Sequence, residues 1–248
     1  MITQFKTELY MNVAVIFAGG QGSRFYNFGR PKQFLEFRGK PIVVYTIEIF
    51  QHIQEVDGII VVCLEDWIPY LERQVRKFHL TKVVEIVPGG KTGQDSICQG
   101  VQCVSRHYPD DTMVLIHDAV RPLAKEDTVM ECIAVAREKG NCVVCVPVME
   151  TILVRQTDAR LQIPNRAYSL NARAPQCFAL KDVLAAHQRA RQEGKNDFVD
   201  TCTMMHHYGH EIHMTLGTMD NIKITTPADY FMFRAILEAR EVGDVFGL

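Results

Sequence analysis

The run NVAVIF (Asn12–Phe17) leads directly into the loop AGGQGSR (Ala18–Arg24). An unbroken apolar run of this length is typical of a strand buried on both faces of a parallel sheet. The loop places glycines at positions 19, 20 and 22, and glycines allow successive backbone N–H groups to turn toward an anion. Together the two segments predict a strand that ends in a phosphate-binding loop.

Working outward, short apolar runs rich in β-branched residues alternate with segments of helical period. Further strands are predicted at Gly58–Leu64, Val83–Val87, Met113–His117 and Cys142–Val146, and helices at Pro41–His52, Trp67–Phe78, Gln94–Arg106 and Glu126–Lys139. Strict alternation predicts βαβ units. We therefore expect one α/β domain over residues 1–248, built on a Rossmann-like, mostly parallel sheet that binds its ligand beyond the carboxyl ends of the strands.

The alternation breaks after Val146. Residues 147–178 show no long helical period, so we expect an extended β arm that leaves the main body and returns, with 147–170 as its protruding part. Helices are predicted to resume at Leu180–Gln192 and Asp197–Tyr208. A strand at Glu211–Leu216 and a helix from Pro227 to Glu241 complete the predicted order.

Composition narrows the class of protein. The 248 residues are 47% apolar and 23% charged, with a formal net charge of −2. This balance excludes a disordered chain and a protein that coats nucleic acid by charge. The longest apolar run is far shorter than the roughly 20 residues a membrane helix needs, and the first ten residues lack the apolar region of a signal peptide. We expect a cytoplasmic protein with no membrane partner, whose eight cysteines are buried thiols.

The residues after the glycines suggest phosphate chemistry. The loop lacks the Gly-Lys-Ser/Thr of a Walker A motif and the third glycine of G-x-G-x-x-G. Instead, Arg24 and then Arg30-Pro31-Lys32-Gln33 place cations near the same strand end. Cations beside a phosphate loop suit phosphoryl or nucleotidyl transfer, in which charge builds on a phosphate.

Five segments carry a family resemblance, in order and over nearly the whole chain. They are AGGQGSR with KQF (from Ala18), PGGKTGQDSI (from Pro88), IHDAVRP (from Ile116), VMETI with IPNRAYSLNARAPQCF (from Val148) and DNIKITTPAD (from Asp220). The set resembles the cytidylyltransferases that act on polyol phosphates. The spacing from Gly19 to Lys32 and the runs IPNRAY and NIKITTP look more like the enzymes for ribitol 5-phosphate than those for 2-C-methylerythritol 4-phosphate, which stay the alternative.

The resemblance implies transfer of CMP from CTP to the polyol phosphate by direct in-line attack on the α-phosphorus, with loss of pyrophosphate. By similarity, Arg24 and Lys32 stabilise the transition state, and Arg166 and Lys223 hold the acceptor phosphate. The implied nucleotide contacts are Phe17, Ala18, Gly19, Gly20, Gly22, Gly89, Gly90 and Ser96.

The same resemblance assigns Asp118 to Mg²⁺, and Thr151, Asp200 and Thr201 to the polyol. It also implies a homodimer in which the 147–170 arm carries Thr151 and Arg166 into the partner's site. Asp200 and Thr201 are equally suited to capping a helix. Arg121 is assigned either to structure or to the acceptor phosphate.

Four residues depart from the family pattern, one of them Glu150, which stands where relatives usually carry an aspartate. Gly93 stands where relatives carry an arginine, and Arg173-Ala174 stand where relatives have Gln-Thr or Leu-Thr. These departures leave open a catalytically silent nucleotide-binding regulator. An oxidoreductase that binds a dinucleotide at the first strand is the third possibility.

Overall fold

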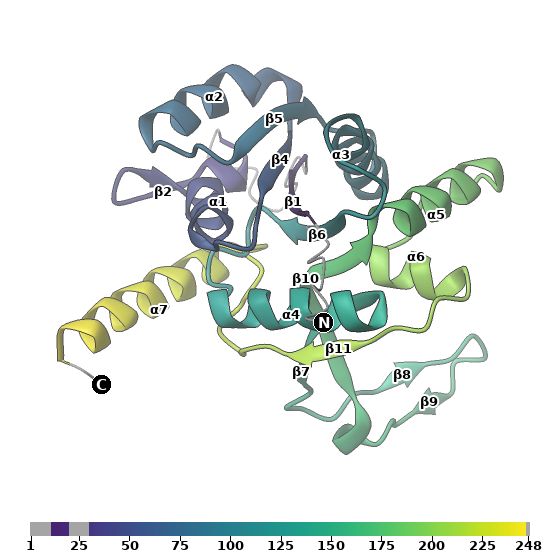
Figure 1. Ribbon diagram of the computed structural model, residues 1–248. Helices are drawn as coiled ribbons and strands as arrows, with labels where there is room; N and C mark the ends of the chain where they lie inside the picture. Colours follow the sequence, from purple (N-terminus) through teal and green to yellow (C-terminus); the bar gives the residue numbers. More distant parts are fainter. Residues whose placement is uncertain (1–10, 20–29, 247–248) are drawn as a thin grey trace, which may run out of the picture.

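A computed structural model describes residues 11–19 and 30–246, with side chains to residue 240. Its centre is a seven-stranded sheet in the order β11-β7-β10-β6-β1-β4-β5 (Figure 1). The strands are β1 (Asn12–Ala18), β4 (Gly58–Cys63), β5 (Val83–Pro88), β6 (Met113–Asp118), β7 (Asn141–Pro147), β10 (Leu170–Ala179) and β11 (Met214–Leu216). Strand β10 runs antiparallel to both of its neighbours, β6 and β7, whereas the other pairs in the sheet are parallel.

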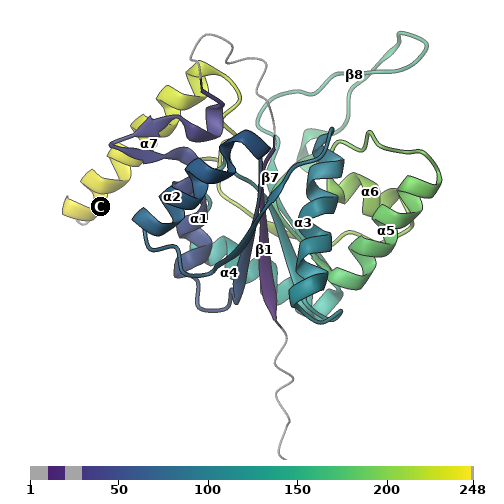
Figure 2. The ribbon, with the colours of Figure 1, turned by 90° about the horizontal axis from the view of Figure 1, so that it is seen from above.

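Helices cover both faces of the sheet (Figure 2). One face carries α1 (Ile42–His52), α2 (Ile68–Lys77) and α4 (Glu126–Lys139), and the other carries α3 (Gly93–His107), α5 (Leu180–Gln192) and α6 (Thr201–His207). Side chains alternate across each strand. Ala14 and Ile16 of β1 therefore pack toward the first group of helices and Val13 and Val15 toward the second. The predicted doubly covered α/β sheet is confirmed.

Smaller elements complete the molecule. They are η2 (Lys32–Phe34), β2 (Glu36–Phe37), β3 (Lys40–Pro41), η3 (Glu65–Trp67), β8 (Val154–Arg155), β9 (Leu161–Gln162), η4 (Arg166–Tyr168) and α7 (Pro227–Phe246). Phe233 of α7 packs in a third apolar cluster with Phe37, Ile42 and Leu123. Within the part of the chain that the structure describes, no helix combines the length and apolarity needed to cross a membrane. The cytoplasmic location stays a prediction.

The first five predicted strands and the first four predicted helices agree with the structure to within one residue at each end. Three boundaries were predicted wrongly, one of them the end of α7, which lies at Phe246 rather than Glu241. Helix α6 begins at Thr201 rather than Asp197, because the Asp200 side chain caps it by accepting from the Thr203 N–H at 2.8 Å. Strand β11 begins at Met214 rather than Glu211.

The return of the arm is the main feature that the sequence did not reveal. Strand β10 lies inside the segment 147–178 and inserts between β6 and β7, at the middle of the sheet. Its first half, LNARA, alternates apolar with polar residues and is exposed at its first three positions, and its register shifts between Ala172 and Gln176. The alternation ends at the register shift, so neither period 2 nor a continuous apolar run extends over the whole strand. The part between β7 and β10 protrudes from the body and holds β8, β9 and η4 (Figures 1 and 2).

Candidate active site

Two glycine-containing loops meet at the carboxyl edge of the sheet. Gly19 follows β1, and Gly89 follows β5, where its N–H donates to the Cys63 carbonyl at 2.8 Å. A Cβ placed on Gly89 would lie 3.4 Å from the Cα of Gly19 and 3.1 Å from Ser96 Oγ. The two backbones therefore approach each other across the end of β4, and a side chain on either loop would crowd this contact.

Ser96 fixes the second loop to helix α3. Its hydroxyl accepts a hydrogen bond from the Gly90 N–H at 3.1 Å and donates one to the Thr92 carbonyl at 2.9 Å. Thr92 caps α3 in a reciprocal capping box with Asp95, so the helix begins sharply. Gly93 follows in the first turn, and a Cβ built on it would meet no heavy atom within 4 Å. The space beside Gly93 belongs to the cavity described next.

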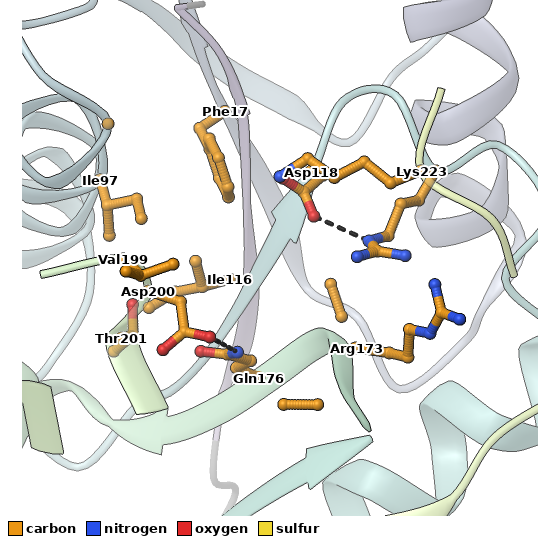
Figure 3. A pocket seen from close by; sticks show the side chains of 14 residues that line it. Phe17, Ile97, Ile116, Asp118, Arg173, Gln176, Val199, Asp200, Thr201 and Lys223 are labelled. Carbon is orange, nitrogen blue, oxygen red and sulfur yellow. Dashed lines mark hydrogen bonds and ion pairs between the residues drawn. The ribbon is translucent and has the colours of Figure 1, made fainter. Parts of the chain in front are cut away.

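A cavity of about 330 Å³ lies at this edge (Figure 3). It is bounded by β1, β6, the start of β10, the first turns of α3 and α6, and the chain before α7. The residues that line it are Phe17, Gly93, Ile97, Ile116, Asp118, Arg121, Ala172, Arg173, Ala174, Gln176, Val199, Asp200, Thr201 and Lys223. A smaller hollow of about 120 Å³ shares Phe17, Asp118 and Lys223 with it and adds Ala18 and Lys32. Cationic side chains therefore converge at the end of the strands.

Asp118 is the anionic centre of this region. Its side chain is only 9% exposed, and its two oxygens contact Arg121 Nε at 2.8 Å and Lys223 Nζ at 2.6 Å. Burial by itself raises the pKa of the carboxyl group, but the charges of Lys223 and Arg121 outweigh it, so the net pKa is lowered. Asp118 is therefore ionised and holds two cations in the floor of the cavity.

Backbone contacts hold this cluster in place. Arg121 Nη1 donates to the Asn221 carbonyl at 3.0 Å, and Asn221 Nδ2 donates to the Ala174 carbonyl at 2.9 Å. One chain of contacts thus joins β6, the segment before α7 and β10. Its contacts give Arg121 a structural role, and because it also lines the cavity, its predicted role at the acceptor phosphate stays open.

The opposite side of the cavity combines the apolar side chains of Ile97, Ile116 and Val199 with the polar groups of Gln176, Asp200 and Thr201 (Figure 3). Gln176 donates to Asp200 Oδ2 at 3.3 Å and accepts from the Cys202 N–H at 2.9 Å. Thr201 is 2% exposed, and its hydroxyl has no hydrogen-bond partner within the described residues. Hydroxyl, amide and carboxylate groups on one wall and cations on the other suit a ligand that combines hydroxyls with phosphate.

Comparison with known proteins decides the family. Residues 12–239 match the family described as IspD: 2-C-methyl-D-erythritol 4-phosphate cytidylyltransferase.

The chain belongs to this cytidylyltransferase family.

Its relatives fall into two groups. A ribitol-5-phosphate cytidylyltransferase of Streptococcus agalactiae serotype III is 43% identical over 239 residues, which is 96% of this chain and 100% of the relative. One from Vibrio parahaemolyticus is 41% identical over 238 residues, covering 96% and 100%. A 2-C-methyl-D-erythritol 4-phosphate cytidylyltransferase of Clostridium botulinum is 36% identical over 228 residues, covering 92% and 97%.

A solved structure confirms the architecture. The 4-diphosphocytidyl-2C-methyl-D-erythritol synthase of Anaerococcus prevotii has a TM-score of 0.79 at 23% identity, covering 93% of this chain and 97% of that one. At this identity the match establishes the fold. The expected α/β architecture is confirmed. The family match and the relatives described above show that the present chain is a nucleotidyltransferase.

The structure gathers most of the predicted site residues at one edge of the sheet. Cavity-lining or loop positions are occupied by Phe17, Ala18, Gly19, Lys32, Gly89, Gly90, Ser96, Asp118, Asp200, Thr201 and Lys223. Gly20, Gly22 and Arg24 lie outside the described residues. Arg30 is paired with Glu36 at 2.9 Å and does not line either cavity.

Thr151 and Arg166 are not brought to this edge by their own chain. Both are exposed on the arm, and Arg166 Nη1 donates to the Met149 carbonyl at 3.0 Å. Neither lines the cavities that hold Asp118 and Lys223.

Sequence reasoning missed Gln176 as a cavity residue and noted Arg173 only as a departure from the family pattern near the polyol pocket. Both belong to β10, whose place in the sheet was not predicted. The available signal was the polar run NARAPQ, which begins at Asn171, inside a segment that ends in the buried pair Cys177 and Phe178.

Proposed function

We propose that this cytidylyltransferase transfers CMP from CTP to ribitol 5-phosphate, giving CDP-ribitol and pyrophosphate. The observation that carries this proposal is the cationic cavity around Asp118, which opens beside the two glycine loops and is also lined by the polar side chains of Gln176, Asp200 and Thr201. Identities of 43% and 41% to ribitol-5-phosphate enzymes over their whole length, against 36% to a methylerythritol-phosphate enzyme, favour ribitol 5-phosphate.

The chemistry needs positioning and charge neutralisation. A phosphate oxygen of the acceptor forms a bond to the α-phosphorus of CTP while the bond from that phosphorus to the pyrophosphate oxygen breaks. Lys32 and Lys223 line the same hollow and place positive charge where phosphates meet. Arg24 contributes a third cation by family resemblance. Preorganised charges of this kind each commonly supply about 10²–10³ in rate.

The two substrates occupy different parts of the site. The Gly19 and Gly89 loops bind CTP through main-chain groups, next to Phe17 and Ala18. The larger cavity receives the acceptor, with Asp200 and Thr201 facing its hydroxyls and Lys223 its phosphate. Each substrate thus meets the groups that match its chemistry, and the shared residues Asp118 and Lys223 lie where the two meet.

Asp118 also suits a divalent metal. Enzymes of this family generally use one, and Mg²⁺ prefers one or two carboxylates together with substrate phosphates. Oxygen Oδ1 of Asp118 is held by Lys223, whose side chain is 41% exposed, so the lysine can turn to a phosphate and release the oxygen. When bound, Mg²⁺ supplies positive charge to the nucleotide phosphates. Asp118 holds it, and Arg121 keeps the other carboxylate oxygen in place.

The arm supports a homodimer. Thr151 and Arg166 lie on it, away from their own cavity, so they reach a substrate only in a partner's site. Exposed apolar side chains cover the arm: Met149, Leu153, Val154, Leu161, Ile163, Tyr168 and Leu170. A patch of this kind marks an interaction surface. The arm of residues 147–170 pairs two copies of a single cytidylyltransferase domain over residues 1–248.

Pyrophosphate release tests the function. Purified protein is given CTP and Mg²⁺ with ribitol 5-phosphate or 2-C-methylerythritol 4-phosphate in parallel. We expect turnover with ribitol 5-phosphate and loss of about 10²-fold or more in Lys223→Met, while Lys181→Met, at an exposed position on α5, stays active. Turnover with methylerythritol phosphate alone would overturn the acceptor, and no pyrophosphate with either would favour the silent regulator.

A further inference from the structure

Arg173 lines the larger cavity, and its guanidinium has no partner among the residues that the structure describes. The side chain is half-buried, and its Nε is fully buried without a hydrogen bond in the described part of the chain. No ion pair with a described carboxylate satisfies it either. Taking a cation out of water without a partner is unfavourable. The unpaired guanidinium therefore lowers the stability of the folded protein, and an anionic ligand bound to it would offset this loss.

The two neighbouring cations, Arg121 and Lys223, do have protein partners. Arg121 donates to Asp118 and to the Asn221 carbonyl, and Lys223 is paired with Asp118. Burial lowers the pKa of Arg173 first, and the nearby charge of Arg121 lowers it further. Arg173 and Arg121 thus repel each other, and a dianion placed beside them would reduce that repulsion.

Arg173 lies on the side of the site where the acceptor is proposed to bind, away from the two nucleotide loops. In the sheet order, β10 lies on one side of β6, whereas β1 and β5, which carry the glycine loops, lie on the other. Arg173 lines the larger cavity with Asp200 and Thr201 but not the smaller hollow with Lys32. Figure 3 shows its side chain rising from β10 toward the region below Asp118 and Lys223.

We infer that Arg173 binds the phosphate of the acceptor and so selects a polyol that carries a phosphate monoester. This inference rests on the proposed function. The planar guanidinium offers two parallel N–H groups to two phosphate oxygens, which a lysine cannot match. Lys223 contacts the same phosphate on the side that faces the α-phosphorus of CTP. Arg173 therefore acts on the KM for the acceptor and leaves CTP binding unchanged.

Steady-state kinetics of Arg173→Gln and Arg173→Lys test the inference. We expect the KM for ribitol 5-phosphate to rise by about 10- to 100-fold in Arg173→Gln and by less in Arg173→Lys, with the KM for CTP unchanged. Arg189→Gln, which alters a surface ion pair on α5, is the matched control. An unchanged acceptor KM in Arg173→Gln, or an equal rise in the KM for CTP, would overturn the inference.

Stability without substrate provides an independent readout. Because Arg173 has no partner in the described ranges 11–19 and 30–240, Arg173→Gln should unfold at the same temperature as the wild type or at a higher one. Ribitol 5-phosphate should raise the midpoint of the wild type much more than that of the variant. A midpoint lowered in Arg173→Gln would assign Arg173 a structural role and refute the inference. Wild-type protein that turns over neither acceptor would instead refute the proposed function.

A separate cluster lies between β5 and α3. Oxygen Oε2 of Glu85 accepts from the Cys103 thiol at 3.2 Å and from His107 Nε2 at 2.7 Å, while Oε1 accepts from Arg106 at 3.0 Å. The potential ligand atoms of Glu85, Cys103 and His107 all lie within 4.8 Å of one another. Cys103 and His107 are one helical turn apart on α3, and Glu85 faces them from the edge strand.

The Cys103 thiol and the His107 ring both direct a hydrogen at Glu85 Oε2. A cation bound by the three side chains would take the place of these two hydrogens. Thiolate, imidazole and carboxylate are the donors that Zn²⁺ and similar divalent ions prefer, and together they carry two negative charges. Burial first, and then Glu85, raise the pKa of the Cys103 thiol to about 12, so binding must displace its proton. Arg106 stays on the other oxygen and keeps the carboxylate oriented.

We propose that Glu85, Cys103 and His107 bind a divalent ion of the zinc type, with water in the fourth position on the exposed side of His107. The ion joins the edge strand β5 to helix α3, whose first turn holds Ser96. It therefore stabilises the folded protein without entering the catalytic cavity.

Titration of the full-length protein with Co²⁺ tests this site, because a thiolate ligand produces a sulfur-to-cobalt charge-transfer band. We expect one equivalent to develop the band, Zn²⁺ to abolish it, and Zn²⁺ to raise the midpoint of thermal unfolding. The band should be absent in Cys103→Ser and weakened in His107→Ala, and it should persist in Cys202→Ser, which changes a partly exposed cysteine elsewhere. A band that survives in Cys103→Ser, or no band in the wild type, would refute the proposal.

Discussion

Substitution of Gly19 by alanine tests the contact between the two nucleotide loops. The added Cβ would lie 2.8 Å from Ser96 Oγ, about 0.6 Å closer than the 3.4 Å at which ordinary contact begins. Ser96 cannot simply turn away, because its hydroxyl holds the Gly90 N–H and the Thr92 carbonyl. The loop after β1 must therefore move. Overpacking of this size costs about 1–3 kcal/mol of stability.

The same shift should reduce catalysis. A misplacement near 1 Å costs about 10²-fold in rate, so we expect kcat/KM for CTP to fall by about 10-fold or more in Gly19→Ala. Ser96→Ala alone removes the acceptor of the Gly90 N–H and should cost about 1 kcal/mol. In the double variant, the nearest atom to the new methyl group is the Cβ of residue 96 at 3.4 Å, which is an ordinary contact.

The double-mutant cycle therefore has a predicted sign. Gly19→Ala/Ser96→Ala should be less destabilised than the sum of the single variants by about 1–2 kcal/mol, measured by urea unfolding. It should also recover part of the loss in kcat/KM that Gly19→Ala suffers. If the two changes add to within about 0.5 kcal/mol, the two loops do not meet through Ser96 and the reasoning fails.

Three further predictions concern acid sensitivity, packing and the arm. Burial lowers the pKa of His187 to about 4, so the unfolded chain takes up the proton first and stability falls by about 3 kcal/mol as the pH drops from about 6.5 to 4. The pKa of buried His117 is also lowered to about 4, so both histidines contribute to this loss of stability. In urea unfolding, His187→Leu should remove about half of the combined loss. A variant that loses as much stability as the wild type over the same pH range would contradict this assignment. Gly100→Ala would place a Cβ 2.4 Å from Val15 Cγ1 and should cost about 1–3 kcal/mol, whereas Gly93→Ala on the same helix, with open space around it, should be neutral or stabilising in the same assay. Mixing equal amounts of inactive Arg166→Ala and Lys223→Met subunits should restore about a quarter of wild-type activity if the arm completes the partner's site, and no recovery after subunit exchange would place Arg166 outside it.

Local patterns in the sequence determined the layers of this protein and many of the residues at the carboxyl edge of the sheet, where the active site lies. Apolar runs of strand length and helical periodicities are set by residues close together in the chain, so β1, β4, β5, β6 and β7 could be placed to within one residue. The carboxyl ends of parallel strands lie at one edge. The glycines after β1 and Asp118 at the end of β6 could therefore be expected at a common site, and the family resemblance added the glycines after β5. The family motifs added the reaction.

Only the tertiary structure decided how distant segments meet. Strand β10 pairs with β6 and β7 through contacts such as Cys177 with Leu115 and with Cys142, and no single local period runs through a strand that is exposed at its start, shifts register and is buried at its end. The insertion of β10 brings Arg173 and Gln176 into the cavity, and the return of the chain after β11 brings Lys223 to Asp118. These contacts form because the whole folded chain gains free energy by burying apolar side chains and pairing charges. Their free energies depend on spatial neighbours rather than on neighbours in sequence.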